Sequence, residues 1–96
     1  MIEIDVPTLF RATAAVCSHL QEIGISKLQI EHDFFWELPE EKRYDMESKP
    51  SDFEVGQLSD NLLSVERIAN GSAEPIAFAL CWIAPILRAV GERVVR

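Results

Sequence analysis

The sequence predicts a mainly α-helical fold, because apolar residues recur at helical spacing, capping residues stand at the helix boundaries, and only one stretch alternates like a strand. We expect three principal helices, at about 6–23, 57–70 and 74–91, and a short extended or two-stranded segment around 27–36 and 53–55. The chain of 96 residues is close to the commonest domain size, so a single domain over 1–96 is expected.

The first helix has clear signals at both ends. Asp5 can cap its N-terminus, Pro7 suits its first turn, and Gly24 is a typical stop. Between them the apolar residues that share one helical face are Leu9, Ala12, Val16, Leu20 and Ile23.

The extended segment follows directly. Leu28 and Ile30 alternate with polar residues, and the aromatic triplet Phe34-Phe35-Trp36 comes next. The short stretch 53–55 is a possible strand partner, although such a ribbon is stable only when it is packed on helices. The polar, proline-containing residues 38–52 between them are expected to form a long loop.

The last two helices differ in character. The second has one apolar face and an Asn70-Gly71 stop, whereas the third is apolar on almost every side between Ile76 and Leu87. Ser72 is expected to cap the third helix with Pro75 in its first turn, and Gly91 to end it. We expect this helix to be central, buried all round by the fold or by a second subunit, and kinked or divided at Pro85.

The charge balance excludes one class of function. The net charge is −7, and residues 31–60 alone carry three basic and ten acidic side chains, which repel a phosphate backbone and make nucleic acid an unexpected partner. No basic and apolar leader opens the chain, and its longest apolar run, 75–87, is shorter than the roughly 20 residues that cross a bilayer. We therefore expect a soluble, cytoplasmic protein without a membrane partner.

Residues with catalytic or metal-binding chemistry are sparse. Cys17 and Cys81 lack metal-site spacing and are expected to be reduced core thiols. His19 and His32 have no partner at ligand spacing, so a boundary role is the simpler interpretation, although a small metal-dependent enzyme centred on His32 stays open as a third hypothesis. Because no nucleophile, phosphate-loop or zinc motif occurs, we expect no enzyme, cofactor or metal.

The aromatic triplet beside an acidic loop favours a protein-binding function. Alternation would turn Phe35 away from its two neighbours, so one aromatic is sandwiched between layers or exposed as an anchor, unless all three are buried. Anchors beside concentrated negative charge suit a basic partner, as in an immunity-like inhibitor. The predicted contact residues are Phe35, Trp36, Glu40, Glu41, Tyr44 and Asp45. The alternative is a structural homo-oligomer, such as a homodimer, assembled through the apolar third helix.

Three sequence boxes resemble a family of small uncharacterised bacterial proteins. They are Asp33-Phe34-Phe35-Trp36-Glu37-Leu38-Pro39, Gly56-Gln57-Leu58-Ser59-Asp60, and the stretch from Trp82 to Gly91 with its Leu87-Arg88-Ala89 core. The resemblance covers about residues 26–92 and implies a bacterial cytoplasmic protein of the accessory or immunity kind, with no activity to transfer. Pro85 departs from the small or aliphatic residue expected there, which puts the placement of the last helical turns in doubt.

Overall fold

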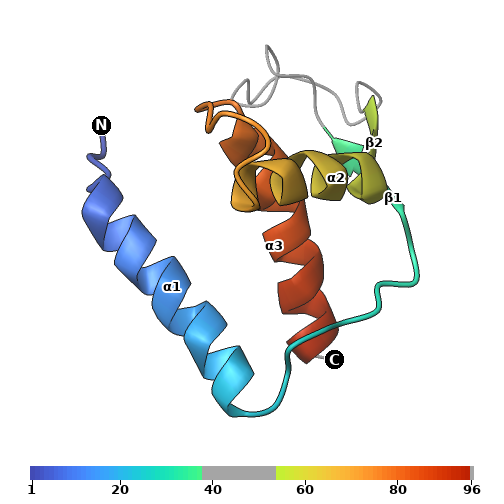
Figure 1. The fold of residues 1–96 in the computed structure, drawn as a ribbon, viewed down its shortest axis with the longest axis horizontal. Coiled ribbons are helices and arrows are strands. Elements are labelled where there is room, and N and C mark those ends of the chain that lie inside the picture. Colours follow the sequence, from blue (N-terminus) through green and yellow to red (C-terminus); the bar gives the residue numbers. More distant parts are fainter. Residues whose placement is uncertain (38–53, 96) are drawn as a thin grey trace.

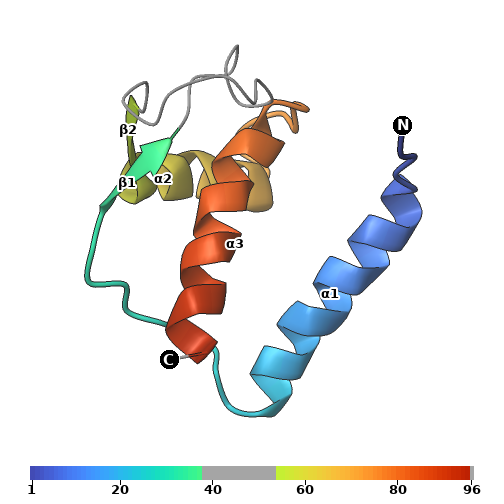
Figure 2. The same cartoon turned by 180° about the vertical axis from the view of Figure 1, so that it is seen from behind.

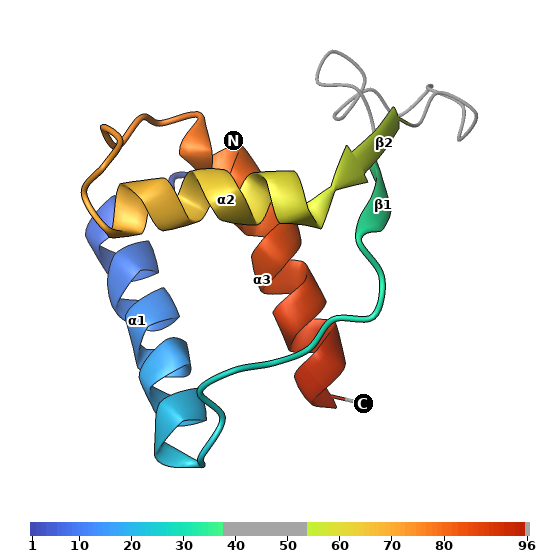
Figure 3. The same cartoon turned by 45° about the vertical axis from the view of Figure 1, so that its right-hand side comes forward.

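The computed structural model describes residues 1–37 and 54–95. In chain order the described elements are α1 (Val6–Glu22), β1 (Phe34–Glu37), β2 (Glu54–Gln57), α2 (Leu58–Ala69) and α3 (Ala79–Val95). Helices dominate, which confirms the predicted fold class. In all three views α3 lies between α1 and the β hairpin, and α2 packs across α3 (Figures 1, 2 and 3).

Local signals at both ends specify α1, as predicted. The Asp5 carboxylate accepts a hydrogen bond from the Thr8 amide at 2.9 Å and another from the Thr8 hydroxyl, and these bonds lower the pKa of Asp5. At the other end Gly24 adopts φ 91°, and the Ile25 amide donates to the Leu20 carbonyl at 2.9 Å. This left-handed glycine stop turns the chain away from the helix axis.

The extended segment forms a strand only in its last part. β1 and β2 pair antiparallel, with Phe35 opposite Gly56 and Trp36 opposite Val55, which confirms the predicted ribbon. Residues 27–33, which we expected to be strand-like, have no partner strand and run irregularly past the C-terminal end of α3 (Figure 1). The alternation of apolar and polar residues in this segment nevertheless matches the burial of its side chains. Leu28 and Ile30 are half-buried, and the residues that follow each of them are exposed.

The predicted start of the third helix is wrong. Ser72 does not cap α3. It completes the end of α2 instead, where its amide donates to the Arg67 carbonyl at 2.9 Å and Gly71 takes φ 81°. A tight turn then leads into α3, in which the amide of Ala79 donates to the carbonyl of Ile76 at 3.0 Å. Residues 74–78 therefore connect the helices and do not open α3.

The predicted end of the third helix is also wrong. Gly91 does not stop α3, which continues to Val95. Arg88 and Glu92 lie one helical turn apart on either side of this glycine, and they form an ion pair between Nε and Oε1 at 3.2 Å. Such a pair supports the continuation of the helix. The predicted division at Pro85 does not occur either, since α3 runs through that residue as one helix.

The third helix is not buried all round, contrary to expectation. Among the described residues only Ala79 and Ala89, both on α3, are buried. Leu80 and Leu87 stay exposed on α3. Since the described residues include no large, fully buried apolar side chain, much of the apolar surface that usually stabilises a domain is open to other molecules.

The close approach of Phe35 to Gly56 gives a test of the hairpin. A Cβ atom at Gly56 would overlap the Phe35 ring, so Gly56→Ala should displace that ring and lower the free energy of unfolding by about 1–3 kcal/mol, measured by urea denaturation. In a Phe35→Ala background the same glycine substitution should cost much less, because the overlapping ring is gone. Equal costs in the two backgrounds would contradict the contact.

Candidate interaction surface

One side of the β hairpin presents an apolar surface. Alternation on β1 places Phe34 and Trp36 on the same side, and the strand register adds Val55, which lies opposite Trp36. Their exposed fractions are 64%, 72% and 58%, so none of the three is covered by the described part of the chain. We call Phe34, Trp36 and Val55 the hairpin face.

The other side of the hairpin faces the helices. Phe35 is half-buried and lies over Gly56, where the lack of a side chain leaves room for the ring. It also lines a hollow of about 330 Å³, whose lining includes Trp36 of β1 and Pro85 and Ala89 of α3. Phe35 therefore supports the hairpin from the side of the helices, while the three residues of the hairpin face stay largely exposed.

Asp33 fixes the hairpin to the start of α2. Its carboxylate accepts hydrogen bonds from the Ser59 amide at 2.7 Å, the Ser59 hydroxyl at 2.8 Å and the Gln57 side-chain amide at 2.9 Å. Its main-chain carbonyl accepts a fourth from the Leu58 amide at 2.7 Å. The Gln57 bond, followed by the two Ser59 bonds, lowers the pKa of the Asp33 carboxyl.

This capping is unusual because the carboxylate comes from 26 residues away in the sequence. Gln57 occupies the N-cap position of α2 but makes no side-chain capping bond to the helix. Asp33 satisfies the free amides of the first turn instead, and its negative charge lies at the positive end of the helix dipole. The hairpin is thereby held in a defined orientation on the α2–α3 pair.

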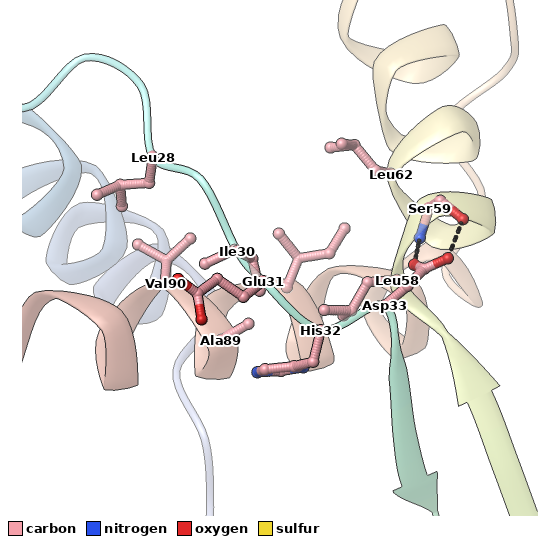
Figure 4. Close-up of a pocket in the computed structure, with 11 residues that line it drawn as sticks. Leu28, Ile30, Glu31, His32, Asp33, Leu58, Ser59, Leu62, Ala89 and Val90 are labelled. Carbon is pink, nitrogen blue, oxygen red and sulfur yellow. Dashed lines mark hydrogen bonds between the residues drawn. The ribbon is translucent and has the colours of Figure 1, made fainter.

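An open hollow of about 320 Å³ lies behind this joint (Figure 4). Its apolar walls come from three parts of the chain, and its lining includes Ile30, Leu58, Leu62, Ile86, Ala89 and Val90. Glu31 and His32 stand at its rim, but the described residues contain no cluster of three His, Cys, Asp or Glu side chains that could hold a metal ion. The hollow is thus an incompletely filled apolar core with a polar edge.

The chain segments on either side of the hairpin face are acidic. Residues 28–37 and 54–66 contain six Asp and Glu residues and no Lys or Arg. Arg88 of α3 is the described cation that lines the hollow beneath Phe35 and Trp36, and Glu92 pairs with it at 3.2 Å. A partner approaching the hairpin face therefore meets apolar side chains within a negatively charged field.

The residues predicted from sequence fall into three groups. Trp36 lies on the exposed hairpin face, and Phe35 lies beneath it. The remaining predicted contacts lie outside the described residues; they are Glu40, Glu41, Tyr44 and Asp45. Sequence reasoning did not select Phe34 or Val55, although alternation along a strand already pairs Phe34 with Trp36, and only the register of the ribbon reveals Val55.

The cysteines do not occupy the predicted core positions. Cys17 and Cys81 are free thiols, as expected, but both are exposed on their helices. Their apolar neighbours in the sequence suggested burial, yet the described part of the chain covers neither side chain. His19 and His32 are exposed as well.

Comparison of the chain with protein-family models, with curated proteins and with solved structures finds no match. The resemblance to small bacterial proteins therefore stays a prediction. Within the described residues, no helix is both long enough and apolar enough to cross a membrane.

The Asp33 cap gives a pH-dependent prediction. Because its pKa is lower in the folded protein than the roughly 3.9 of an unfolded aspartate, the unfolded state binds more protons between the two values. Asp33 therefore stabilises the fold fully above the unfolded pKa, and this stabilisation is lost as the pH falls through the folded pKa. At neutral pH Asp33→Asn should lower the urea midpoint, and the gap from the natural protein should close on acidification.

The matched control is Glu66→Gln, which removes an exposed carboxylate from the same helix. It should leave the urea midpoint nearly unchanged at neutral pH. A gap between Asp33→Asn and the natural protein that stays constant down to acid pH would show that the carboxylate charge does not stabilise the cap.

Proposed function

We propose that the protein is a protein-binding module that captures a basic partner through the hairpin face. The observation that carries this proposal is the exposure of Phe34, Trp36 and Val55 on one side of a ribbon that Asp33 anchors to α2. Large aromatic side chains of this kind supply most of the binding energy in protein interfaces when a partner buries them.

The anchoring favours affinity. An aromatic on a mobile segment loses conformational freedom when it binds, and this loss opposes association. In this chain the ribbon that carries Trp36 is fixed by four hydrogen bonds to Asp33 and rests on Phe35. The binding surface is therefore largely organised before a partner arrives.

The charge distribution favours a basic partner. Residues 31–60 hold ten acidic and three basic side chains, which accounts for the whole net charge of −7. Such a field raises the association rate of a positively charged protein and repels acidic ones. A small acidic chain with these properties suits an immunity-type inhibitor that covers the active or nucleic-acid-binding face of a basic enzyme or toxin.

Two further parts of the proposal, the contribution of residues 40–45 and the cellular location, rest on the sequence and the cysteines rather than on contacts in the structure. Glu40, Glu41, Tyr44 and Asp45 extend the binding surface on the basis of their sequence position beside the hairpin. A cytoplasmic location is supported by Cys17 and Cys81, because exposed free thiols persist in a reducing compartment.

Substitutions on the hairpin face test the proposal. The tagged chain should recover one basic protein in stoichiometric amount from lysate of the source organism, and the purified pair then allows rate measurements. Phe34→Ala and Trp36→Ala should each speed dissociation about thirtyfold, the effect of a 2 kcal/mol hot spot. Ile76→Ala, which trims an exposed apolar residue in the connection between α2 and α3, is the matched control. Unchanged dissociation in both aromatic variants would exclude the hairpin face.

Charge reversal separates steering from anchoring. Glu40→Lys combined with Glu41→Lys should slow association with the same partner about tenfold or more at low ionic strength and flatten its dependence on salt. The dissociation rate should change little, since these side chains are proposed to act before contact. An unchanged association rate would remove the acidic segment from the proposal.

A further inference from the structure

The N-terminal helix carries an uncovered apolar stripe. Leu9, Val16 and Ile23, which ends the helix, are spaced seven residues apart on one side of α1, and each is more than half exposed. α1 is well capped, yet it makes no extensive contact with another described element and stands apart in the views (Figures 1 and 2). A helix of 17 residues gains little stability alone in water, so this stripe needs a surface to pack on.

α3 carries a second stripe with the same spacing. Leu80, Leu87 and Val94 are seven residues apart and exposed, on the opposite side of α3 from the buried Ala89. The small residues Ala84 and Gly91 lie between them, and an open hollow on this side of α3 is lined by residues that include Ala84, Leu87 and Gly91. Small residues between large ones leave the holes into which side chains of a facing helix can insert.

The two stripes match each other. Both span three large aliphatic residues, both follow the seven-residue repeat of paired helices, and α1 and α3 are each 17 residues long. Neither stripe packs on the other within the described residues, because α1 makes no extensive contact with α3 there.

Charge permits two copies to meet along these helices. α1 contains Arg11 and Glu22 and so carries no net charge at neutral pH, and α3 has a net charge of +1. The excess negative charge lies in residues 31–60, between the two stripes in the sequence. Contact through α1 and α3 therefore avoids direct opposition of like charges, whereas contact between two hairpin faces would bring the acidic residues together.

We infer that two copies of this chain associate reciprocally, with the stripe of α1 from each chain packed on the stripe of α3 from the other. Two-fold symmetry buries all four stripes at once, because each chain offers one of both kinds. The stripes and their exposed neighbours Val6, Phe10 and Val95 provide nine residues per chain. At roughly 100 Å² each, two chains would bury about 1,800 Å², which is the size of a stable interface.

Cysteine pairs test which chain covers the stripes. Val16 and Leu87 are the middle residues of their stripes, so they meet whether the helices pair parallel or antiparallel. In a background with Cys17→Ser and Cys81→Ser, one preparation carries Val16→Cys and another carries Leu87→Cys. The two are unfolded together, refolded and oxidised mildly, and the products are separated without reductant and identified by mass.

The expected product is a mixed covalent dimer of Val16→Cys with Leu87→Cys, formed in far higher yield than with Ser18→Cys, which places the thiol on the opposite side of α1. Light scattering of the natural protein should give the mass of two 10.9 kDa chains across a dilution series. Circular dichroism of each variant confirms that the helices are retained.

Two results would overturn the inference. If a single chain carrying both Val16→Cys and Leu87→Cys forms its disulfide only within itself, α1 closes on its own α3. If light scattering shows one chain at every concentration and the mixed dimer forms no better than the Ser18→Cys control, the stripes do not pair between copies. Neither result bears on the hairpin face, whose test uses a different surface and a different partner.

Discussion

The carboxylate of Asp33 holds the described fold together, because it joins the β hairpin to the first turn of α2. It replaces the side-chain cap that Gln57 does not provide, and it accepts hydrogen bonds from the Ser59 amide and hydroxyl. The main-chain carbonyl of Asp33 accepts a further bond from the Leu58 amide. Since α2 packs on α3, one residue links the ribbon to the helical pair. The exposed aromatics of the hairpin owe their fixed direction to this joint and to the packing of Phe35 beneath the ribbon.

The sequence predicts the features that depend on neighbouring residues. Asp5, Pro7 and Gly24 mark both ends of α1 because capping acts within a few residues. The same local reasoning fails at Ser72, which can serve either the end of one helix or the start of the next, and the Arg67 carbonyl is the partner it finds. The capping of α2 by Asp33 is beyond local patterns, since the two sites are 26 residues apart.

Apolar patterns reveal which faces avoid water but not which surface will cover them. The run from Ile76 to Leu87 was expected to be buried on every side, yet the described chain covers one side of α3 and leaves Leu80 and Leu87 open. Alternation likewise separated Phe35 from Trp36, but only the pairing with Gly56 and Val55 shows that Phe35 lies beneath the ribbon and Trp36 above it. Burial depends on contacts between distant residues, which the periodicity of one segment does not contain.

The distribution of charge favours different partners for the two kinds of exposed apolar surface in the two proposals. The stripes on α1 and α3 lie on nearly neutral helices, where a second copy can approach without repulsion. The hairpin face lies in the acidic third of the sequence, so two hairpins repel each other while a basic protein is attracted. In the proposed dimer the stripes are buried in the interface between the two chains, and both hairpin faces stay exposed. Such a dimer would bind a basic partner with two copies of the site, and a partner that itself carries two matching sites would be held with greater avidity than one hairpin provides.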